Sequence, residues 1–294
     1  MKKITILSAV AGLTILAAMA VQAQTGGALA ALQGYAGAPA PDAPAAKAEV
    51  AGGITGYVAG SDQADGLPAK PAEWVTISGG KFTMGTDSGE EGFEDANPAH
   101  EVTIKTFQLA KTAVTVAQYT ECVSKGACTE PATGSYCNWG KAGRGSHPVN
   151  CVDWDQAQAY AKFKGARLPS EAEFEYAATS GGRNQKYPWG NEEPTRELAV
   201  FNTDSTMPVC SKPKGNTAQG LCDMSGNVWQ WVQDKYQDSY EGAPVDGSAF
   251  EGAGYSRVFR GGAFLNDASY LRAGFRYGYG PSGNGGSVGF RLAR

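Results

Sequence analysis

The sequence predicts an irregular α+β domain, in which a few short helices lie among short strands and many loops. Three observations lead to this fold class. Alternating apolar and polar residues occupy the first part of the domain, and three helix-capping sequences follow between residues 115 and 182. Beyond Gly182 the helical periodicity ends, and short strand-like runs, glycine turns and aromatic residues continue to the C-terminus. The predicted domain covers residues 72–294, a length of roughly 220 residues that one unit accommodates.

Strands are expected at the start of this domain. Trp74–Ile77 ("WVTI") contains the aromatic and β-branched residues that strands favour. The stretch "SGGKFTMG" is typical of a turn followed by a strand, and "HEVTIKTFQLA" (residues 100–110) alternates as a further strand. The domain therefore begins with β-structure.

Three helices are expected from their N-terminal caps. Thr115 starts a capping box that leads into "AQYTECVSK". Asp153 caps "WDQAQAYAKFKG", and Gly165 ends that helix. Ser170 starts another capping box, and the third helix stops at Gly181-Gly182.

Residues 1–23 have the three parts of a secretory signal peptide. Lys2 and Lys3 form the positive region, an apolar stretch follows, and Val21-Gln22-Ala23 is a small-x-small cleavage site. The apolar stretch is too short for a stable membrane span. The cleavage point has no cysteine, so a lipid anchor is not indicated. We expect the protein to be exported, to the periplasm or the medium, without membrane insertion.

Residues 24–71 are expected to form a flexible tether. Ala, Gly and Pro dominate this segment, as in "GYAGAPAPDAPAAKAEVAGG", and large apolar side chains are few. Such a segment buries too little apolar surface to offset the entropy that is lost on ordering. The predicted organisation is thus a signal peptide at 1–23, a tether at 24–71 and one domain at 72–294.

The charge of the chain limits its partners. The formal net charge is −4, and the sequence has no basic stripe. Nucleic acids and anionic membranes attract basic surfaces, so neither is expected as a partner. A protein, a peptide or a surface ligand remains.

Six cysteines are expected to form disulfides, because an even number in an exported chain is typical of a disulfide framework. Neighbours along the chain are expected to pair, as Cys122–Cys128, Cys137–Cys151 and Cys210–Cys222. Six cysteines allow fifteen pairings, so the other combinations stay open. Metal ligation is less favoured, since no CxxC occurs and the two histidines share no motif with the cysteines.

Six motifs occur in the order in which one known family has them. They are "GGKFTMGTDSGEEGFEDANPAHEVTI", "HPVNCVDWDQAQAYAKFKGARLPSEAEFEYAA", "YPWGNEEP", "GLCDMSGNVWQWVQDKY", "RVFRGGAF" and "GFRLAR". Together they resemble the formylglycine-generating enzyme family, also called the sulfatase-modifying factor domain, from about Trp74 to Arg294. The resemblance implies a variant of the C-type-lectin fold, with two or three helices around twisted antiparallel sheets, many loops and bound calcium.

The oxidase chemistry of that family is not expected here. Its enzymes handle copper and oxygen with two cysteines that follow the RGG motif. Aligned on "RGGAFLNDASYL", these positions are Asn266 and Leu271, and neither residue supplies a thiolate, the soft ligand that selects Cu(I). No GxSxG elbow and no HExxH motif offers another route. We therefore expect no catalytic residues and no copper.

Calcium is the cofactor that the resemblance implies, at "CDMSGNVWQW". Carried over position by position, the ligands are the Asp223 side chain, the Gly226 and Val228 carbonyls and the Gln230 side chain. The family has Glu where this chain has Gln230, and the lost charge should weaken calcium binding. The alternative is a calcium-free turn held by Asn227, and the sequence leaves both open.

The C-terminal segment is expected to form a binding surface. Between the framework strands "RVFRGGA" and "VGFRLAR" it combines Tyr with Ser, Gly and Asn, as antibody binding loops do for rigid contact area and adaptable hydrogen bonds. In lectin-fold relatives this surface faces the ligand. The residues expected to contact a ligand are Phe264, Asn266, Asp267, Tyr270, Leu271, Phe275, Tyr277, Tyr279, Ser282 and Asn284.

The same segment resembles the variable proteins of diversity-generating retroelements, which end in GFRLA-like sequence. Their variation replaces adenines in AAY codons, so Lys, Glu, Gln, Met and Trp do not arise at varied positions. All five residue types are absent from residues 257–294. The ordinary glycine-rich composition of a loop-built fold also explains this absence, so hypervariability is one of two interpretations.

Two classes of function remain. The first is an exported, non-catalytic ligand-binding module that displays its C-terminal surface from the tether. The second is a formylglycine-generating-type oxidase, or another divergent oxidative enzyme, that acts on a peptide in the same groove. Asn266 and Leu271 favour the first.

Overall fold

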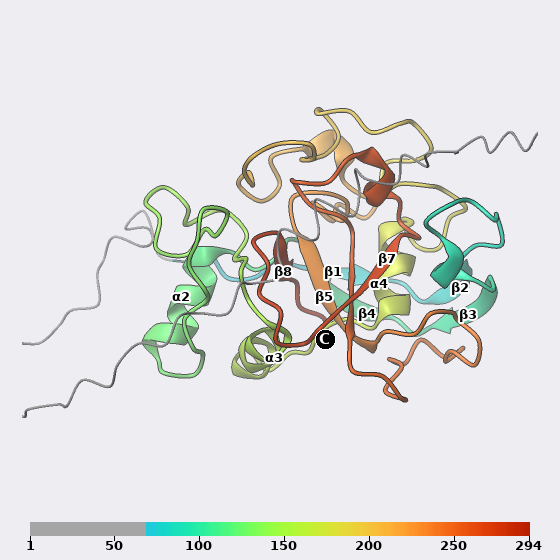
Figure 1. The fold of residues 1–294 in the computed structure, drawn as a ribbon, viewed down its shortest axis with the longest axis horizontal. Coiled ribbons are helices and arrows are strands. Elements are labelled where there is room, and N and C mark those ends of the chain that lie inside the picture. The colour runs from blue at the N-terminus through green and yellow to red at the C-terminus, as the bar shows by residue number, and fades with distance from the viewer. Residues whose placement is uncertain (1–68) are drawn as a thin grey trace, which may run out of the picture. The chain divides into compact units, whose positions relative to one another are not determined.

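Two small antiparallel sheets begin the domain in the computed structural model, which describes residues 69–294 (Figure 1). The first strand pairs with the fourth, and the second with the third. The stretch at 100–110 is therefore two strands with different partners, and the single strand expected there is wrong. The bounds are β1 (Trp74–Ile77), β2 (Gly80–Met84), β3 (His100–Ile104) and β4 (Phe107–Ala110).

The break between β3 and β4 lies beside the turn at Gly79. The Gly79 amide donates to the Thr106 hydroxyl at 3.1 Å, and a Cβ on Gly79 would lie 2.3 Å from the Ile104 carbonyl oxygen. Only glycine allows this close approach of two backbones. The chain therefore changes from one sheet to the other at this point.

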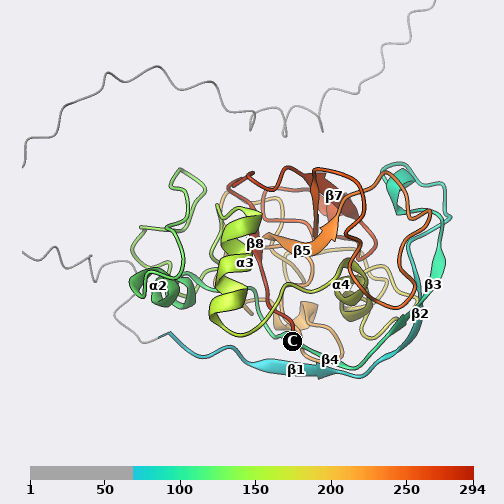
Figure 2. The ribbon, with the colours of Figure 1, turned by 90° about the horizontal axis from the view of Figure 1, so that it is seen from below.

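The three expected helices are present, and each begins at its expected cap. Thr115, Asp153 and Ser170 each accept a hydrogen bond from the backbone amide three residues later, within a complete capping box. Figure 2 shows the third helix between the β2–β3 pair and the larger sheet, and it contacts both. Their bounds are α2 (Val116–Ser124), α3 (Trp154–Phe163) and α4 (Glu171–Ala178).

A four-stranded sheet follows, in the order β7-β6-β5-β8. The β5–β8 pairing is parallel and the other two pairings are antiparallel. Among the described residues, the only helices after Gly182 are short 3-10 turns, so the expected irregular, loop-rich α+β fold is confirmed. The bounds are β5 (Trp229–Lys235), β6 (Arg257–Arg260), β7 (Arg276–Tyr279), β8 (Val288–Phe290), η1 (Glu94–Ala96), η2 (Pro213–Gly215) and η3 (Ala268–Leu271).

The end of the chain connects the first strands to the rest of the domain. Ala293 forms isolated bridges with Leu109 and with Arg167, and the Gln108 amide donates to the Arg294 carbonyl at 2.8 Å. Figure 2 shows the C-terminus beside β1 and β4. The "GFRLAR" motif thus continues from β8, an edge strand of the larger sheet, and bonds to the first strands of the domain.

All six cysteines are paired, as Cys122–Cys128, Cys137–Cys151 and Cys210–Cys222. The preference for neighbours along the chain is therefore confirmed. The Cys–Cys pairs close loops with sequence separations of 6, 14 and 12 residues. Such loops constrain the unfolded chain and so stabilise the fold.

In the part of the chain that the structure covers, no helix is long and apolar enough to cross a membrane. The predicted signal peptide at 1–23 and residues 24–68 of the predicted tether lie outside the described residues.

Candidate functional site

Four aromatic side chains of the C-terminal segment are half-buried and lie close together. We call Tyr270, Phe275, Tyr277 and Tyr279 the aromatic surface. Tyr277 and Tyr279 are two positions apart in β7 and therefore extend from the same face of the sheet. The Tyr270 and Phe275 rings, with centroids 4.9 Å apart, continue the cluster from η3 to the start of β7.

Buried rings support the aromatic surface from below. Tyr277 stacks on Phe259 with centroids 5.6 Å apart, and Tyr279 stacks on Trp231 at 6.3 Å. Trp229 contacts the Phe275 ring at 6.0 Å and the Tyr270 ring at 6.3 Å. Each such pair contributes about 0.5–1.5 kcal/mol beyond its buried area. The core therefore holds the four half-buried rings in position.

Two glycines of the segment make room for aromatic rings, Gly283 for Tyr279 of the aromatic surface and Gly278 for the neighbouring Tyr236. A Cβ on Gly283 would lie 2.0 Å from the Tyr279 ring, and a Cβ on Gly278 would lie 2.4 Å from the Tyr236 ring. The Gly283 position is on the loop between β7 and β8, so this loop packs directly against the aromatic surface. The glycines of the segment therefore have a packing role at this site.

Polar residues expected in the surface lie around it with different exposure. Asp267, Ser282 and Asn284 are exposed, whereas Asn266 is half-buried. Asp267 caps η3 by accepting from the Ser269 amide at 2.9 Å. The Asn266 side-chain oxygen accepts from the Ala263 amide at 3.0 Å, which holds the turn after β6.

Two of the expected contact residues, Phe264 and Leu271, are fully buried, at 0% exposure. Leu271 packs with Tyr187 and Ala199, and Phe264 lies near the Tyr136 ring. In this structure both belong to the support of the site and not to its contact surface. Their apolar side chains are better stabilised inside the core than at a solvated surface.

Positions 266 and 271 also offer no thiol. Asn266 uses its amide oxygen in the turn, and Leu271 lies among apolar side chains. Every cysteine of the chain is in a disulfide, so no thiolate is present elsewhere to replace them. Copper coordination by a cysteine pair therefore finds no ligands at this place.

Three of the residues expected to bind calcium, Asp223, Gly226 and Val228, lie in a buried loop before β5, and Gln230 lies in β5 itself. Protein donors already bond to Asp223, Gly226 and Gln230. Gln230 is fully buried: its Nε2 donates to the Asp223 carbonyl at 2.9 Å, and its Oε1 accepts from the Arg291 Nε. The Asp223 carboxylate accepts from the Cys210 amide at 2.9 Å, and the Gly226 carbonyl accepts from the Val228 amide at 3.0 Å.

Calcium requires six to eight oxygen ligands, most of them free to point at the ion. The bonded oxygens of this loop and the guanidinium beside them do not fit that requirement. In the described part of the chain, no group of three His, Cys, Asp or Glu side chains is arranged for a metal. The alternative of a turn held by Asn227 agrees with the geometry, because that side chain bonds to both the amide and the carbonyl of Met207, each at 3.1 Å.

Burial dominates the electrostatics of this loop. It raises the pKa of Asp223, although the hydrogen bond from the Cys210 amide acts in the opposite direction. It lowers the pKa of Arg291 to about 10, and the Asp223 carboxylate opposes this shift. Arg291 therefore remains cationic at neutral pH.

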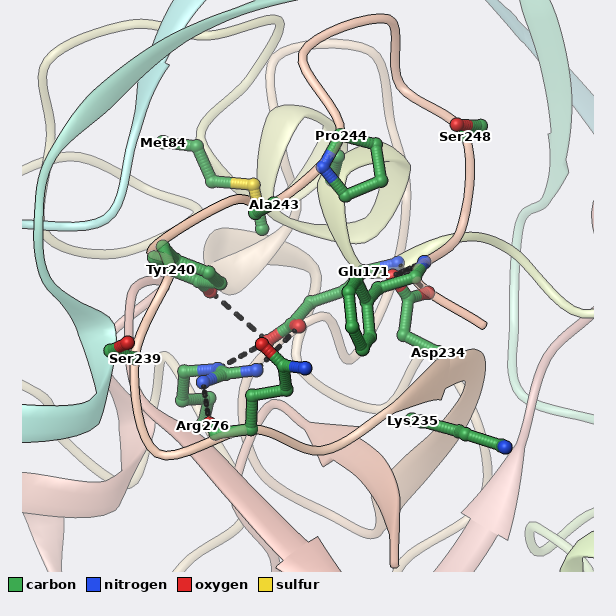
Figure 3. A pocket seen from close by; sticks show the side chains of 13 residues that line it. Met84, Glu171, Asp234, Lys235, Ser239, Tyr240, Ala243, Pro244, Ser248 and Arg276 are labelled. Carbon is green, nitrogen blue, oxygen red and sulfur yellow. Dashed lines mark hydrogen bonds and ion pairs between the residues drawn. The ribbon is translucent and has the colours of Figure 1, made fainter. Parts of the chain in front are cut away.

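A second polar site lies between α4 and the four-stranded sheet, and it was not predicted from the sequence. Figure 3 shows Arg276 and Tyr240 converging on the Glu171 carboxylate. Arg276 donates two hydrogen bonds to Glu171, at 2.7 and 2.9 Å, and Arg260 donates one at 2.9 Å. Arg260 also pairs with Glu175, one turn further along the helix. We call Glu171, Glu175, Arg260 and Arg276 the buried ion cluster.

The buried ion cluster connects α4 to β6 and β7, and β7 carries Tyr277 and Tyr279 of the aromatic surface. The cavity beside it measures about 20 Å³, enough for one water molecule and too small for an organic substrate. The cluster therefore has a structural role. A signal was present in "SEAEFEYAA", where three glutamates alternate with apolar residues in a helix that has no polar face.

Comparison with known proteins identifies the family. The family profile described as "Sulfatase-modifying factor enzyme 1-like domain" matches residues 61–294. The formylglycine-generating enzyme of Streptomyces coelicolor is 32% identical, over 74% of this chain and 88% of that enzyme. The serine/threonine-protein kinase Pkn1 of Chlamydia trachomatis is 34% identical over 76% of this chain, but the match spans only 38% of the kinase.

Solved structures agree. PvdO from Pseudomonas aeruginosa is 33% identical, with a TM-score of 0.66 over 76% of this chain and 94% of that one. Treponema denticola variable protein 1 has a TM-score of 0.59 over 75% of this chain and 94% of that one; its 22% identity shows a shared fold alone. From its family profile, its relatives and its fold, the chain belongs to the sulfatase-modifying factor family, whose members include the formylglycine-generating enzymes.

Proposed function

We propose that this protein is an exported ligand-binding module, secreted or periplasmic, whose aromatic surface contacts a protein, a peptide or a surface ligand without oxidising it. The observation that supports this most is the stacking of Tyr277 and Tyr279 on the buried Phe259 and Trp231. Tyrosines that are already fixed lose little side-chain entropy when a ligand binds, so their contact area adds directly to affinity.

The polar residues around the aromatic surface suit the same role. Asp267, Ser282 and Asn284 are exposed and can exchange water for ligand hydrogen bonds. Such a mixture of rigid aromatic groups and small polar groups is typical of binding loops. The ligand is therefore expected to bury the four rings and to bond at their rim.

The absence of a thiol supports a non-catalytic role. With all six cysteines in disulfides and Leu271 inside the core, the copper-dependent route has no ligands in this chain. The second candidate is still an oxidative enzyme, because the relative from Streptomyces coelicolor, 32% identical, is a formylglycine-generating enzyme.

Selection of peptides from a random displayed library tests the binding proposal. Peptides that bind the wild-type protein should bind the double variant Tyr277→Ser/Tyr279→Ser at least about tenfold more weakly, since two central aromatic contacts are lost. Val245→Ser is the matched control, because Val245 is 60% exposed and its carbonyl bonds to β3, away from the rings. Binders that lose affinity only with the control would contradict the proposal.

An oxidation assay separates the two candidates. The protein is loaded with copper and incubated in air with a peptide that contains cysteine, and the peptide is then analysed by mass spectrometry for an aldehyde. We expect no more aldehyde than free copper produces in the absence of the protein. Turnover by the protein would replace the binding proposal with the enzyme.

A further inference from the structure

Arg291, from the last motif "GFRLAR", is fully buried in the loop where the family resemblance implies calcium. All five N–H groups of its guanidinium have an oxygen partner. The Nε donates to Gln230 Oε1, and the two terminal nitrogens donate to four backbone carbonyls. These carbonyls belong to Ala110 (3.1 Å), Lys111 (3.3 Å), Cys222 (2.7 Å) and Asp223 (3.2 Å).

We propose that the Arg291 guanidinium is the resident cation of this loop, and that the protein folds without calcium there. The guanidinium already bonds to two of the expected calcium-binding residues, through the Gln230 side chain and the Asp223 carbonyl. A calcium ion would have to remove Gln230 Oε1 from Arg291 and would add two positive charges next to a buried one. Opposed charges attract and like charges repel most strongly where water is excluded.

The loop already contains a cation. Arg291 is buried beside Asp223, and the Gln230 side chain is uncharged. A calcium ion would therefore meet a single carboxylate and a buried guanidinium, whereas calcium sites gain affinity from several charged ligands.

This arrangement also explains why position 230 is glutamine. Gln230 accepts from Arg291 with its oxygen and donates to the Asp223 carbonyl with its nitrogen. Glutamate accepts but does not donate, so it would place a negative oxygen against that carbonyl. Glutamine is the residue type that satisfies both neighbours, and the departure from the family sequence follows from the closed loop.

Calcium binding to the full-length protein tests the proposal directly. Wild type and Asp223→Asn are freed of metal with a chelator and dialysed against about 1 mM calcium, where extracellular calcium modules bind. We expect the two proteins to retain the same amount of calcium per chain. One additional ion in the wild type would overturn the proposal.

Thermal unfolding of the wild type provides a readout that needs no variant. We expect the same melting temperature with calcium and with chelator. A melting temperature that rises by several degrees in calcium, and that does so less in Asp223→Asn, would overturn the proposal.

Two substitutions test the role of the guanidinium. Gln230→Glu restores the charge that the family has, yet its melting temperature should remain independent of calcium while Arg291 is present. A calcium-dependent rise in this variant would show that residue 230 decides occupancy and would overturn the proposal. Arg291→Lys keeps the charge but offers three donors for five acceptors, so it should melt several degrees lower.

Arg294→Lys is the matched control for Arg291→Lys. Arg294 is exposed, donates to the Gln108 side chain and lies over the Trp74 ring. Its replacement should leave the melting temperature within about one degree, since surface contacts contribute little. An equal loss in both variants would contradict a special role for Arg291.

Discussion

Removal of one negative charge from the buried ion cluster should strongly destabilise the domain. Glu171→Gln keeps the shape of the side chain but removes the carboxylate that accepts four hydrogen bonds, two from Arg276, one from Arg260 and one from Tyr240. Both arginines are almost fully buried; Arg260 would keep its ion pair with Glu175, whereas Arg276 would lose its ion pair.

The magnitude follows from this burial. Loss of one partner from a buried ion pair costs about 3–5 kcal/mol, because the other charge stays in a low-dielectric interior. For a domain of this size, 1 kcal/mol corresponds to about 2–4 °C in melting temperature. The variant should therefore melt about 6–20 °C below the wild type.

Urea unfolding followed by tryptophan fluorescence measures this change as a free energy. Glu121→Gln is the control, since Glu121 pairs with Lys125 and Lys164 on the surface and should lose at most about 1 kcal/mol. A loss below about 1 kcal/mol for Glu171→Gln would refute the reasoning. It would mean that the arginines find other partners or that water enters the cluster.

The dependence of the free energy of unfolding on pH in acid gives an independent check. Burial alone would raise the pKa of Glu171, but the guanidinium groups of Arg276 and Arg260 lower it. A lowered folded-state pKa means that this carboxylate stabilises the fold above its unfolded value, about 4.3, and that the contribution is lost as pH falls below it. The wild type should therefore lose stability more steeply in acid than Glu171→Gln does.

Three further predictions concern other parts of the molecule. Burial and the nearby Glu171 carboxylate raise the pKa of Asp234 to about 8. The folded state thus holds this proton more tightly than the unfolded chain does. The contribution of Asp234 to stability should therefore decline between pH 4 and pH 8. Urea titrations should show a steeper decline in the wild type than in Asp234→Asn. Gly283→Ala should push the Tyr279 ring aside, change the near-ultraviolet circular dichroism and weaken peptide binding; Gly285→Ala, whose Cβ would only touch Val288 at 3.7 Å, should do neither. Replacement of both cysteines of Cys137–Cys151 by serine should cost about 3 kcal/mol in urea, more than the same change at the shorter Cys122–Cys128 loop, and the reverse order would contradict the loop-entropy account.

Exposure explains why the aromatic surface was only partly foreseen. Tyr277 and Tyr279 are half-buried on an edge strand, whereas Phe264 and Leu271 of the same segment are fully buried. Composition marks a segment as suited to binding, but it does not state which side chains face the core. That choice depends on what packs beneath each residue, here Phe259 and Trp231 for the tyrosines and Tyr187 for Leu271.

The amino-acid order alone was sufficient for features whose partners are close along the chain. Thr115, Asp153 and Ser170 bond to amides three residues away, so their helices could be read directly. The disulfides join cysteines no more than 14 residues apart, and the family motifs are themselves short and contiguous.

Features that join distant segments required the folded chain. Glu171 and Arg276 are 105 positions apart, and Arg291 bonds to a carbonyl 181 positions away. Such contacts form only after the sheets and α4 have packed, because packing brings the charges together and removes the water that would otherwise solvate them. The buried ion cluster, the guanidinium in the loop before β5 and the exposed faces of the C-terminal tyrosines are therefore products of tertiary structure.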